Sequence, residues 1–190
     1  MEDSVEDFKP ISVGFLLMEN FTMISLAAAV EPLRMANLLS EKTLFEWHLI
    51  SENGESQKAS DGISVLVDTS IFEAQVLDVL VVAGGIEVHR GCSFEITKWL
   101  QELDRQGVQL GGICTGAYVL AAAGLLDNYV CSIHWESKTV LKELFPLVQP
   151  NDNLFSVDRS RLTSAGGTAP LDMMINIIRA NFGSDLARAI

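Results

Sequence analysis

Short apolar runs of strand length alternate along this chain with longer segments in which apolar residues recur at helical spacing. The strand-like runs cover residues 11–18, 45–51, 63–67, 76–83, 108–111, 130–134, 155–158 and 161–164. The helix-like segments cover residues 22–39, 94–105, 115–123, 136–144 and 169–181. This alternation is typical of α/β folds with a largely parallel sheet. Since no repeat or linker interrupts it, the pattern predicts one α/β domain.

Three parts of this pattern give more detailed predictions. In the helix at 22–39, the apolar side chains expected to face the core are Leu26, Val30, Leu33 and Leu38. Residues 155–158 and 161–164 are expected to form a hairpin around Arg159-Ser160. Residues 45–51 and 63–67 are expected to be strands around the polar turn at Asn53-Gly54.

The two ends of the chain differ from the middle. Residues 1–9 are acidic and lack a periodic pattern, so we expect a mobile acidic tail followed by one domain over residues 10–190. Residues 184–190 look like the start of a helix that stops without a cap or a polar tail. This indicates a cut inside a longer protein; the alternative is a natural frayed end.

Composition narrows the class of protein. The formal net charge of −12 and the scattered Lys and Arg residues argue against nucleic-acid binding by these residues. Polar residues interrupt the first apolar stretch too early for a membrane span, and no signal peptide precedes it. Three cysteines without CxxC spacing indicate reduced thiols and no metal site. We therefore expect a cytoplasmic protein.

One cysteine lies where a strand turns sharply into a helix. Gly112 and Gly116 flank Cys114, and such a turn exposes the thiol to unpaired N–H groups at a helix start. Because parallel strands end at the same edge, the N–H of Thr115 and the Gly84-Gly85 turn could form an oxyanion hole or a small anion-binding site. The sequence leaves both a nucleophile and a binding site open.

His134 follows a predicted strand and is expected at the same edge. It could be the base for Cys114, with Glu136 or Asp158 orienting its ring, although a lone histidine there is often structural. Trp135 and Glu136 together could hold a cationic amine, or Trp135 could pack in the core. A third possibility is glutamine amidotransfer, which needs a glutamate two residues after the histidine. Glu136 has this spacing, but the sequence shows no partner synthetase domain or motif.

A carboxylate, Glu31, interrupts the apolar helix just before Pro32. If it is buried, it needs a partner such as a thiol or a ligand amine. An ion pair with Arg34, or simple exposure, is the alternative. Neither Gly111-Gly112 nor Gly166-Gly167 fits a phosphate-binding signature, and we expect no cofactor.

Several motifs in order resemble a known family. They are Val13-Gly14-Phe15-Leu16-Leu17, Ala29-Val30-Glu31-Pro32-Leu33-Arg34-Met35-Ala36-Asn37, Ala83-Gly84-Gly85, Gly112-Ile113-Cys114-Thr115-Gly116-Ala117, His134-Trp135-Glu136 and Thr163-Ser164-Ala165-Gly166-Gly167-Thr168-Ala169. Together they resemble the class I glutamine amidotransferase-like fold of the PfpI/ThiJ type, and in particular the amino-terminal sensor domain of AraC-type transcriptional regulators. The resemblance covers the chain from about residue 11 to residue 190.

The resemblance implies a flavodoxin-like three-layer sandwich with helices on both faces of a mostly parallel sheet. It also implies a homodimer and a DNA-binding helix-turn-helix domain after residue 190, absent from this chain. Enzymes of the same branch, such as isonitrile hydratases, carry an acidic residue where Ser25 stands here. A serine cannot tune the thiol as a carboxylate would, which weakens the case for catalysis.

The leading hypothesis is therefore a ligand-sensing regulatory domain that is not an enzyme. Its effector would be a small amine or amino-acid-like metabolite of the arginine, betaine or carnitine type. The expected ligand-binding residues are Cys114, Thr115, Gly84, Gly85, His134, Trp135, Glu136 and Glu31. DNA would be contacted only through the missing domain, and no membrane is involved. The alternative is a hydrolase or hydratase with Cys114 as nucleophile and His134 as base.

Overall fold

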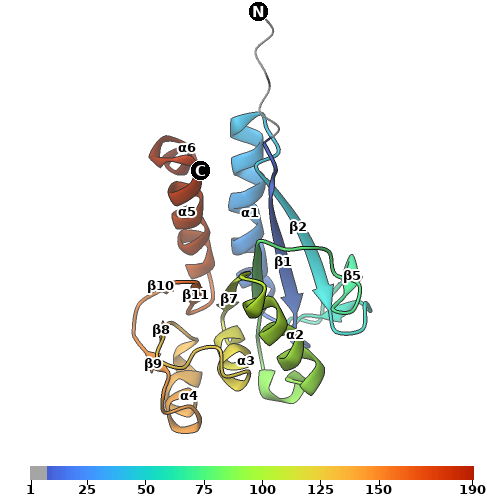
Figure 1. Cartoon of the computed structure of the whole chain (residues 1–190), viewed down its shortest axis with the longest axis vertical. Coiled ribbons are helices and arrows are strands. Elements are labelled where there is room, and N and C mark those ends of the chain that lie inside the picture. The colour runs from blue at the N-terminus through green and yellow to red at the C-terminus, as the bar shows by residue number, and fades with distance from the viewer. Residues whose placement is uncertain (1–7) are drawn as a thin grey trace, which may run out of the picture.

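The computed structural model describes residues 8–190, so most of the predicted acidic tail lies outside the described residues. Its centre is a seven-stranded sheet with the strand order β10-β11-β7-β6-β1-β2-β5 (Figure 1). The strands are β1 (Ile11–Leu17), β2 (Phe45–Ser51), β5 (Thr69–Ser70), β6 (Val79–Ala83), β7 (Gln109–Ile113), β10 (Phe155–Asp158) and β11 (Arg161–Ser164). All neighbouring pairs are parallel except the β10–β11 hairpin. The predicted α/β class and the hairpin are confirmed.

Helices cover both faces of this sheet and complete the three layers. One layer holds α1 (Met23–Ser40), α5 (Ala169–Phe182) and α6 (Ser184–Ala189), which lie side by side in Figure 1. The other holds α2 (Phe94–Arg105) and α3 (Gly116–Ala122). This is the flavodoxin-like arrangement that the family resemblance implies.

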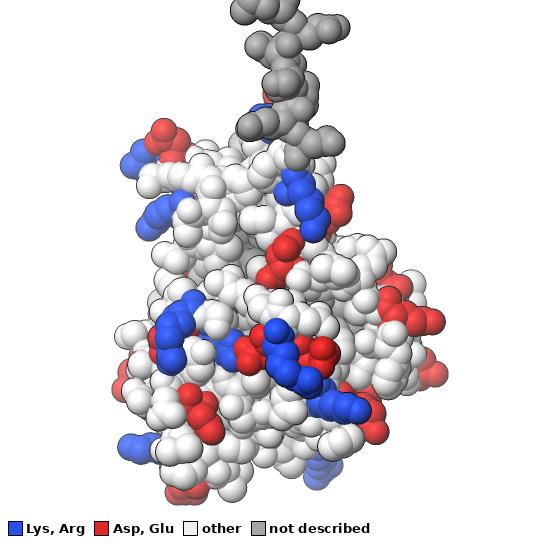
Figure 2. All heavy atoms as spheres, viewed as in Figure 1, with Lys and Arg blue, Asp and Glu red and all other residues white. Residues whose placement is uncertain are grey.

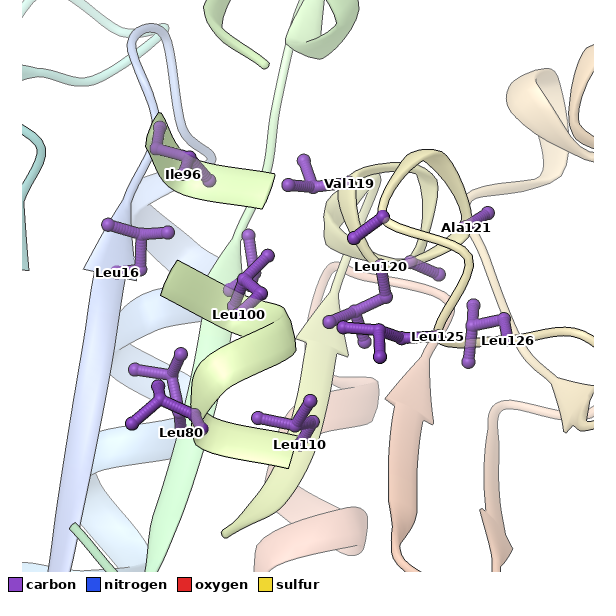
Figure 3. Close-up of a cluster of buried hydrophobic side chains, with 14 of the residues drawn as sticks. Leu16, Leu80, Ile96, Leu100, Leu110, Val119, Leu120, Ala121, Leu125 and Leu126 are labelled. Atoms are coloured by element: carbon purple, nitrogen blue, oxygen red, sulfur yellow. The ribbon is translucent and has the colours of Figure 1, made fainter. Parts of the chain in front are cut away.

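The alternation of side chains along β1 explains why there are two apolar layers. Phe15 packs with the α1 and α5 side chains, whereas Leu16 packs on the opposite face with α2 and α3. Figure 3 shows this second layer, where Leu100 of α2 and Leu120 of α3 meet Leu80 and Leu110 of the central strands. Strands buried on both faces read as continuous apolar runs, which is why the sequence predicted them.

Smaller elements lie outside the main sheet. They are β3 (Gln57–Lys58) with β4 (Ser64–Val65), β8 (Val130–Cys131) with β9 (Gln149–Pro150), the 3-10 turns Val88–Gly91 and Trp135–Ser137, and α4 (Lys138–Leu144). The predicted strand at 63–67 is therefore reduced to β4, which pairs with β3 and not with the main sheet. The predicted helix at 136–144 begins two residues later, after a 3-10 turn.

Two further expectations are wrong. The strand predicted over 130–134 ends at Cys131. The Ser132 N–H donates to the Thr163 hydroxyl at 2.8 Å, so it is not available for pairing between strands. Leu38 is 61% exposed and does not face the core. The physical reason is helical geometry: five residues after Leu33, a side chain has turned by about 140° away from it.

Candidate functional site

The turn between β7 and α3 holds Cys114 in a strained backbone conformation. Its φ of 58° lies in the left-handed region, which a residue with a Cβ seldom adopts. The flanking glycines allow the turn to pack closely: a Cβ on Gly116 would lie 2.0 Å from the Val82 carbonyl oxygen, and one on Gly112 would lie 2.6 Å from the Ala117 nitrogen. The predicted strand–turn–helix geometry around the cysteine is therefore present.

A pocket of about 400 Å³ opens above this turn, at the carboxyl edge of the sheet. Its lining comes from the segment before α1, the β3–β4 hairpin, the ends of β6 and β7, and the 3-10 turn before α4. The lining residues are Thr22, Ser60, Gly85, Ile86, Glu87, Cys114, Thr115, His134, Glu136 and Ser137. Segments far apart in sequence thus meet at one edge, as parallel-strand topology requires.

The thiol of Cys114 is buried and bonded to hydroxyl and amide groups. Its Sγ lies 3.4 Å from the Thr22 hydroxyl. Burial raises the pKa of the Cys114 thiol, and hydrogen bonds from the Thr22 hydroxyl and the Thr115 N–H oppose this only in part. The nearby Glu136 carboxylate raises the pKa further. Burial therefore works against the thiolate, which is the nucleophilic form of a cysteine.

His134 reaches the same edge but does not engage the thiol. Its backbone N–H donates to the Cys114 carbonyl at 3.0 Å, while its ring Nδ1 lies 3.7 Å from a Glu136 carboxylate oxygen. Among the side-chain hydrogen bonds of residues 8–190, none joins the His134 ring to Cys114 Sγ. Asp158, the other possible orienting group, accepts instead from the Val130 N–H at 2.9 Å.

The two glycines after β6 have different roles. Gly85 lines the pocket, and its carbonyl accepts a 2.7 Å hydrogen bond from the Thr115 hydroxyl. Within the described part of the chain, the Gly85 N–H donates to no backbone carbonyl. Gly84 lies behind the lining, where a Cβ would come within 2.4 Å of the Gly116 nitrogen. Gly84 thus allows close packing of the two turns, and Gly85 is the one of the two that faces the pocket.

Besides Gly84, two predicted site residues, Glu31 and Trp135, lie outside the lining. Glu31 is exposed on α1 and pairs with Arg34 at 2.7 Å, so the expectation of a buried carboxylate is wrong and the ion-pair alternative is confirmed. The hydrogen bond from Arg34 lowers the pKa of Glu31. Trp135 is 75% exposed, and its ring lies 5.8 Å from the His134 ring. The alternative that Trp135 packs in the core is wrong.

Sequence reasoning missed five residues of the pocket: Thr22, Ser60, Ile86, Glu87 and Ser137. Thr22 is the clearest case, because a threonine before a helix normally caps it through its hydroxyl. Here Thr22 occupies the N-cap position without a side-chain cap bond, and its hydroxyl contacts the thiol. The local sequence pattern identifies Thr22 as a helix N-cap, but it does not reveal that its hydroxyl contacts Cys114, which is 92 residues away.

Two other kinds of site are absent from residues 8–190. They contain no group of three or more His, Cys, Asp or Glu residues that could hold a metal ion. None of their helices is long and apolar enough to cross a membrane.

Comparison with known proteins identifies the domain. Residues 12–180 match the profile of the DJ-1/PfpI family. The chain belongs to the DJ-1/PfpI family. This confirms the family resemblance seen in the motifs around Cys114 and His134.

Regulators are prominent among the relatives of this DJ-1/PfpI domain. It is 49% identical over 181 residues to the HTH-type transcriptional regulator GbdR of Pseudomonas aeruginosa, covering 95% of this chain and 49% of that protein. It is 42% identical to CdhR of the same organism, covering 91% of this chain and 51% of that regulator. The chain thus spans about half the length of these curated relatives.

A solved structure agrees with these similarities. An AraC family transcriptional regulator from Pseudomonas putida superposes with a TM-score of 0.87 at 32% identity, covering 95% of this chain and 97% of that one. An enzyme is also similar, at greater distance: the isonitrile hydratase of Pseudomonas putida is 26% identical over 183 residues, covering 95% of this chain and 76% of the enzyme.

Proposed function

We propose that this DJ-1/PfpI domain is the effector-binding half of an AraC-type transcriptional regulator that works in the cytoplasm as a homodimer. The effector is a small amine or amino-acid-like metabolite of the arginine, betaine or carnitine type. Binding of the effector controls a DNA-binding helix-turn-helix module that follows residue 190. The similarity to GbdR and CdhR over almost the whole chain supports this assignment.

The charge of the pocket supports a cationic effector and is the observation that carries the proposal. Glu87 and Glu136 line the pocket, and no Lys or Arg is among its lining residues. Glu87 pairs with Arg90 at 2.9 Å, whereas Glu136 has no Lys or Arg partner among residues 8–190 and lies 3.7 Å from the His134 ring. Glu136 is therefore the lining carboxylate that a ligand cation would meet. The Gly85 N–H, which donates to no backbone carbonyl within residues 8–190, suits the carboxylate of an amino-acid-like ligand.

The state of Cys114 supports binding over catalysis. A nucleophilic thiol needs a lowered pKa or an adjacent base. Here burial raises the thiol pKa, and its side-chain partner is the Thr22 hydroxyl. Cys114 then forms part of the pocket floor.

The distribution of charge supports DNA contact through another module. On the face shown in Figure 2, Lys and Arg are interspersed with Asp and Glu and form no continuous basic patch. Together with the net charge of −12, this surface repels a phosphate backbone.

Isothermal titration with arginine, glycine betaine, carnitine and choline tests the proposal. We expect saturable heat with at least one of them, and a loss of at least about tenfold in affinity for Glu136→Gln, which removes one charge at nearly constant shape. Glu31→Gln is the matched control, because Glu31 is exposed and lies outside the pocket lining. Absence of heat with all four compounds would contradict the proposed effector class.

Trp135 offers a second comparison within the same experiment. If its exposed ring covers a bound quaternary ammonium group, Trp135→Leu will weaken betaine, carnitine and choline more than arginine. Equal weakening of all four ligands would assign Trp135 to pocket shape and not to cation recognition.

The second candidate function is a cysteine-dependent hydratase or hydrolase. The strained Cys114 turn and the similarity to isonitrile hydratase favour it. Turnover of an isonitrile that is lost in both Cys114→Ser and His134→Gln would establish this function and displace the regulator proposal.

A further inference from the structure

A second hollow lies at the opposite end of the molecule from the pocket. It is a groove of about 510 Å³ between the end of α1, the turn after it, and the end of α5 with α6. Leu39, Lys42 and Leu44 line one side, and Phe182, Leu186 and Ala189 line the other. In Figure 1 this region lies beside the C-terminus, at the end of the sheet remote from the pocket.

Two exposed leucines lie at the rim of this groove. Leu38 is 61% exposed and Leu39 is 43% exposed, both on the last turn of α1. A pair of adjacent leucines beside an apolar groove is the kind of surface that a partner covers.

Both long helices that border the groove begin at the effector pocket. The N-cap of α1 is Thr22, whose hydroxyl contacts the Cys114 thiol, and α1 reaches the groove 18 residues later, about 27 Å away. The segment before α5 also touches the cysteine, since a Cβ on Gly166 would lie 3.2 Å from Cys114 Sγ. α5 then ends at Phe182 in the groove wall. A ligand that shifts either helix start would therefore act on the groove.

We propose that this groove is the docking surface for the DNA-binding module, and that α1 and α5 couple docking to effector binding. The inference rests on the proposed function. Three features select this occupant: the relatives are about twice as long as this chain, Ala189 lines the groove, and most of the groove lining is apolar, with Ser40 and Lys42 as its polar residues. A segment attached at this point is present at an effective concentration of about a millimolar, so a modest apolar contact holds it.

Charged substitutions in the groove of the full-length protein test this inference. The variants are Leu39→Glu and Ala189→Glu, both at exposed positions that tolerate a charge without loss of the core. Leu66→Glu is the matched control, because Leu66 is 82% exposed and lies outside the groove. Circular dichroism melting curves verify that all three remain folded.

The first measurement is the rate at which subtilisin cleaves between the two halves. We expect the two groove variants to be cleaved at least about tenfold faster than wild type, because undocking exposes the junction, while Leu66→Glu is cleaved at the wild-type rate. Wild-type rates for both groove variants would overturn the inference. A shift from dimer to monomer in light scattering would also overturn it, by assigning the groove to a second copy of the chain.

The second measurement is the affinity for arginine and glycine betaine in the same proteins. Coupling predicts that undocking changes effector affinity by a factor within the usual allosteric range of about 5 to 150, with Leu66→Glu unchanged. Faster cleavage with unchanged affinity would refute the coupling through α1 and α5. If wild type binds neither compound, the proposed function fails, and the proteolysis result still reports on docking.

Discussion

The Cys114 thiol is expected to react slowly with alkylating reagents at neutral pH. Burial raises its pKa above the reference value of 9.0, so fewer than about one thiol in a hundred is ionised at pH 7. Because the thiolate is the reactive form, the alkylation rate should rise about tenfold for each pH unit from pH 6 to pH 8 and reach no plateau below pH 9.

The assay is iodoacetamide labelling of the folded protein under pseudo-first-order conditions. Mass spectrometry of the peptide that contains Cys114 separates it from Cys92 and Cys131, whose pKa values are also raised by burial. The denatured protein gives the rate of the unburied thiol at each pH.

Thr22 provides the matched perturbation. Its hydroxyl lowers the pKa of Cys114, so Thr22→Val should move the labelling profile to higher pH, whereas Thr22→Ser keeps a hydroxyl and should stay close to wild type. A plateau below pH 7.5 in the wild-type protein would refute this reasoning. It would show a stable thiolate and strengthen the enzyme alternative.

Three further predictions concern stability and are measured as free energies of unfolding in urea. Gly116→Ala places a Cβ against backbone and should cost about 3 kcal/mol or more, against about 1 to 2 kcal/mol for Gly107→Ala, which is strained by its φ of 84° but meets open space; equal costs would contradict the close packing of the turn. Asn37→Ala removes three hydrogen bonds of 2.8 to 2.9 Å that join α1 to the start of β2, at about 1 kcal/mol each. Asn37→Asp should keep the two bonds from the Leu44 and Phe45 N–H groups to Oδ1 and lose the bond to the Phe45 carbonyl, because a carboxylate cannot donate. Arg161→Met leaves the Asp104 carboxylate and the Leu125 carbonyl without their buried guanidinium partner. The expected cost is about 2 to 3 kcal/mol, at the low end for a buried ion pair because Asp104 is partly exposed. A cost below about 1 kcal/mol would show that Arg161 acts mainly through packing.

The sequence by itself determined the fold class and the order of most elements. Strands buried on both faces and helices with one apolar stripe leave local periodic signals, so α2 and the β10–β11 hairpin were predicted at their observed bounds. The Cys114 turn was also readable locally, because Gly112 and Gly116 mark close backbone approach. Short elements such as β4 and β8 were overestimated, since their pairing is decided by contacts outside the local pattern.

Only the tertiary structure decided the chemistry of the pocket. Whether Glu31 is buried depends on which side of α1 faces the sheet, and it faces solvent. Whether Cys114 is a thiolate depends on burial and on Thr22, a residue 92 positions away. Residue identity and spacing are local properties, whereas desolvation and the distance between side chains exist only after the chain has folded. The sequence could therefore identify the cysteine turn, whereas the burial that raises the pKa of its thiol comes from the fold.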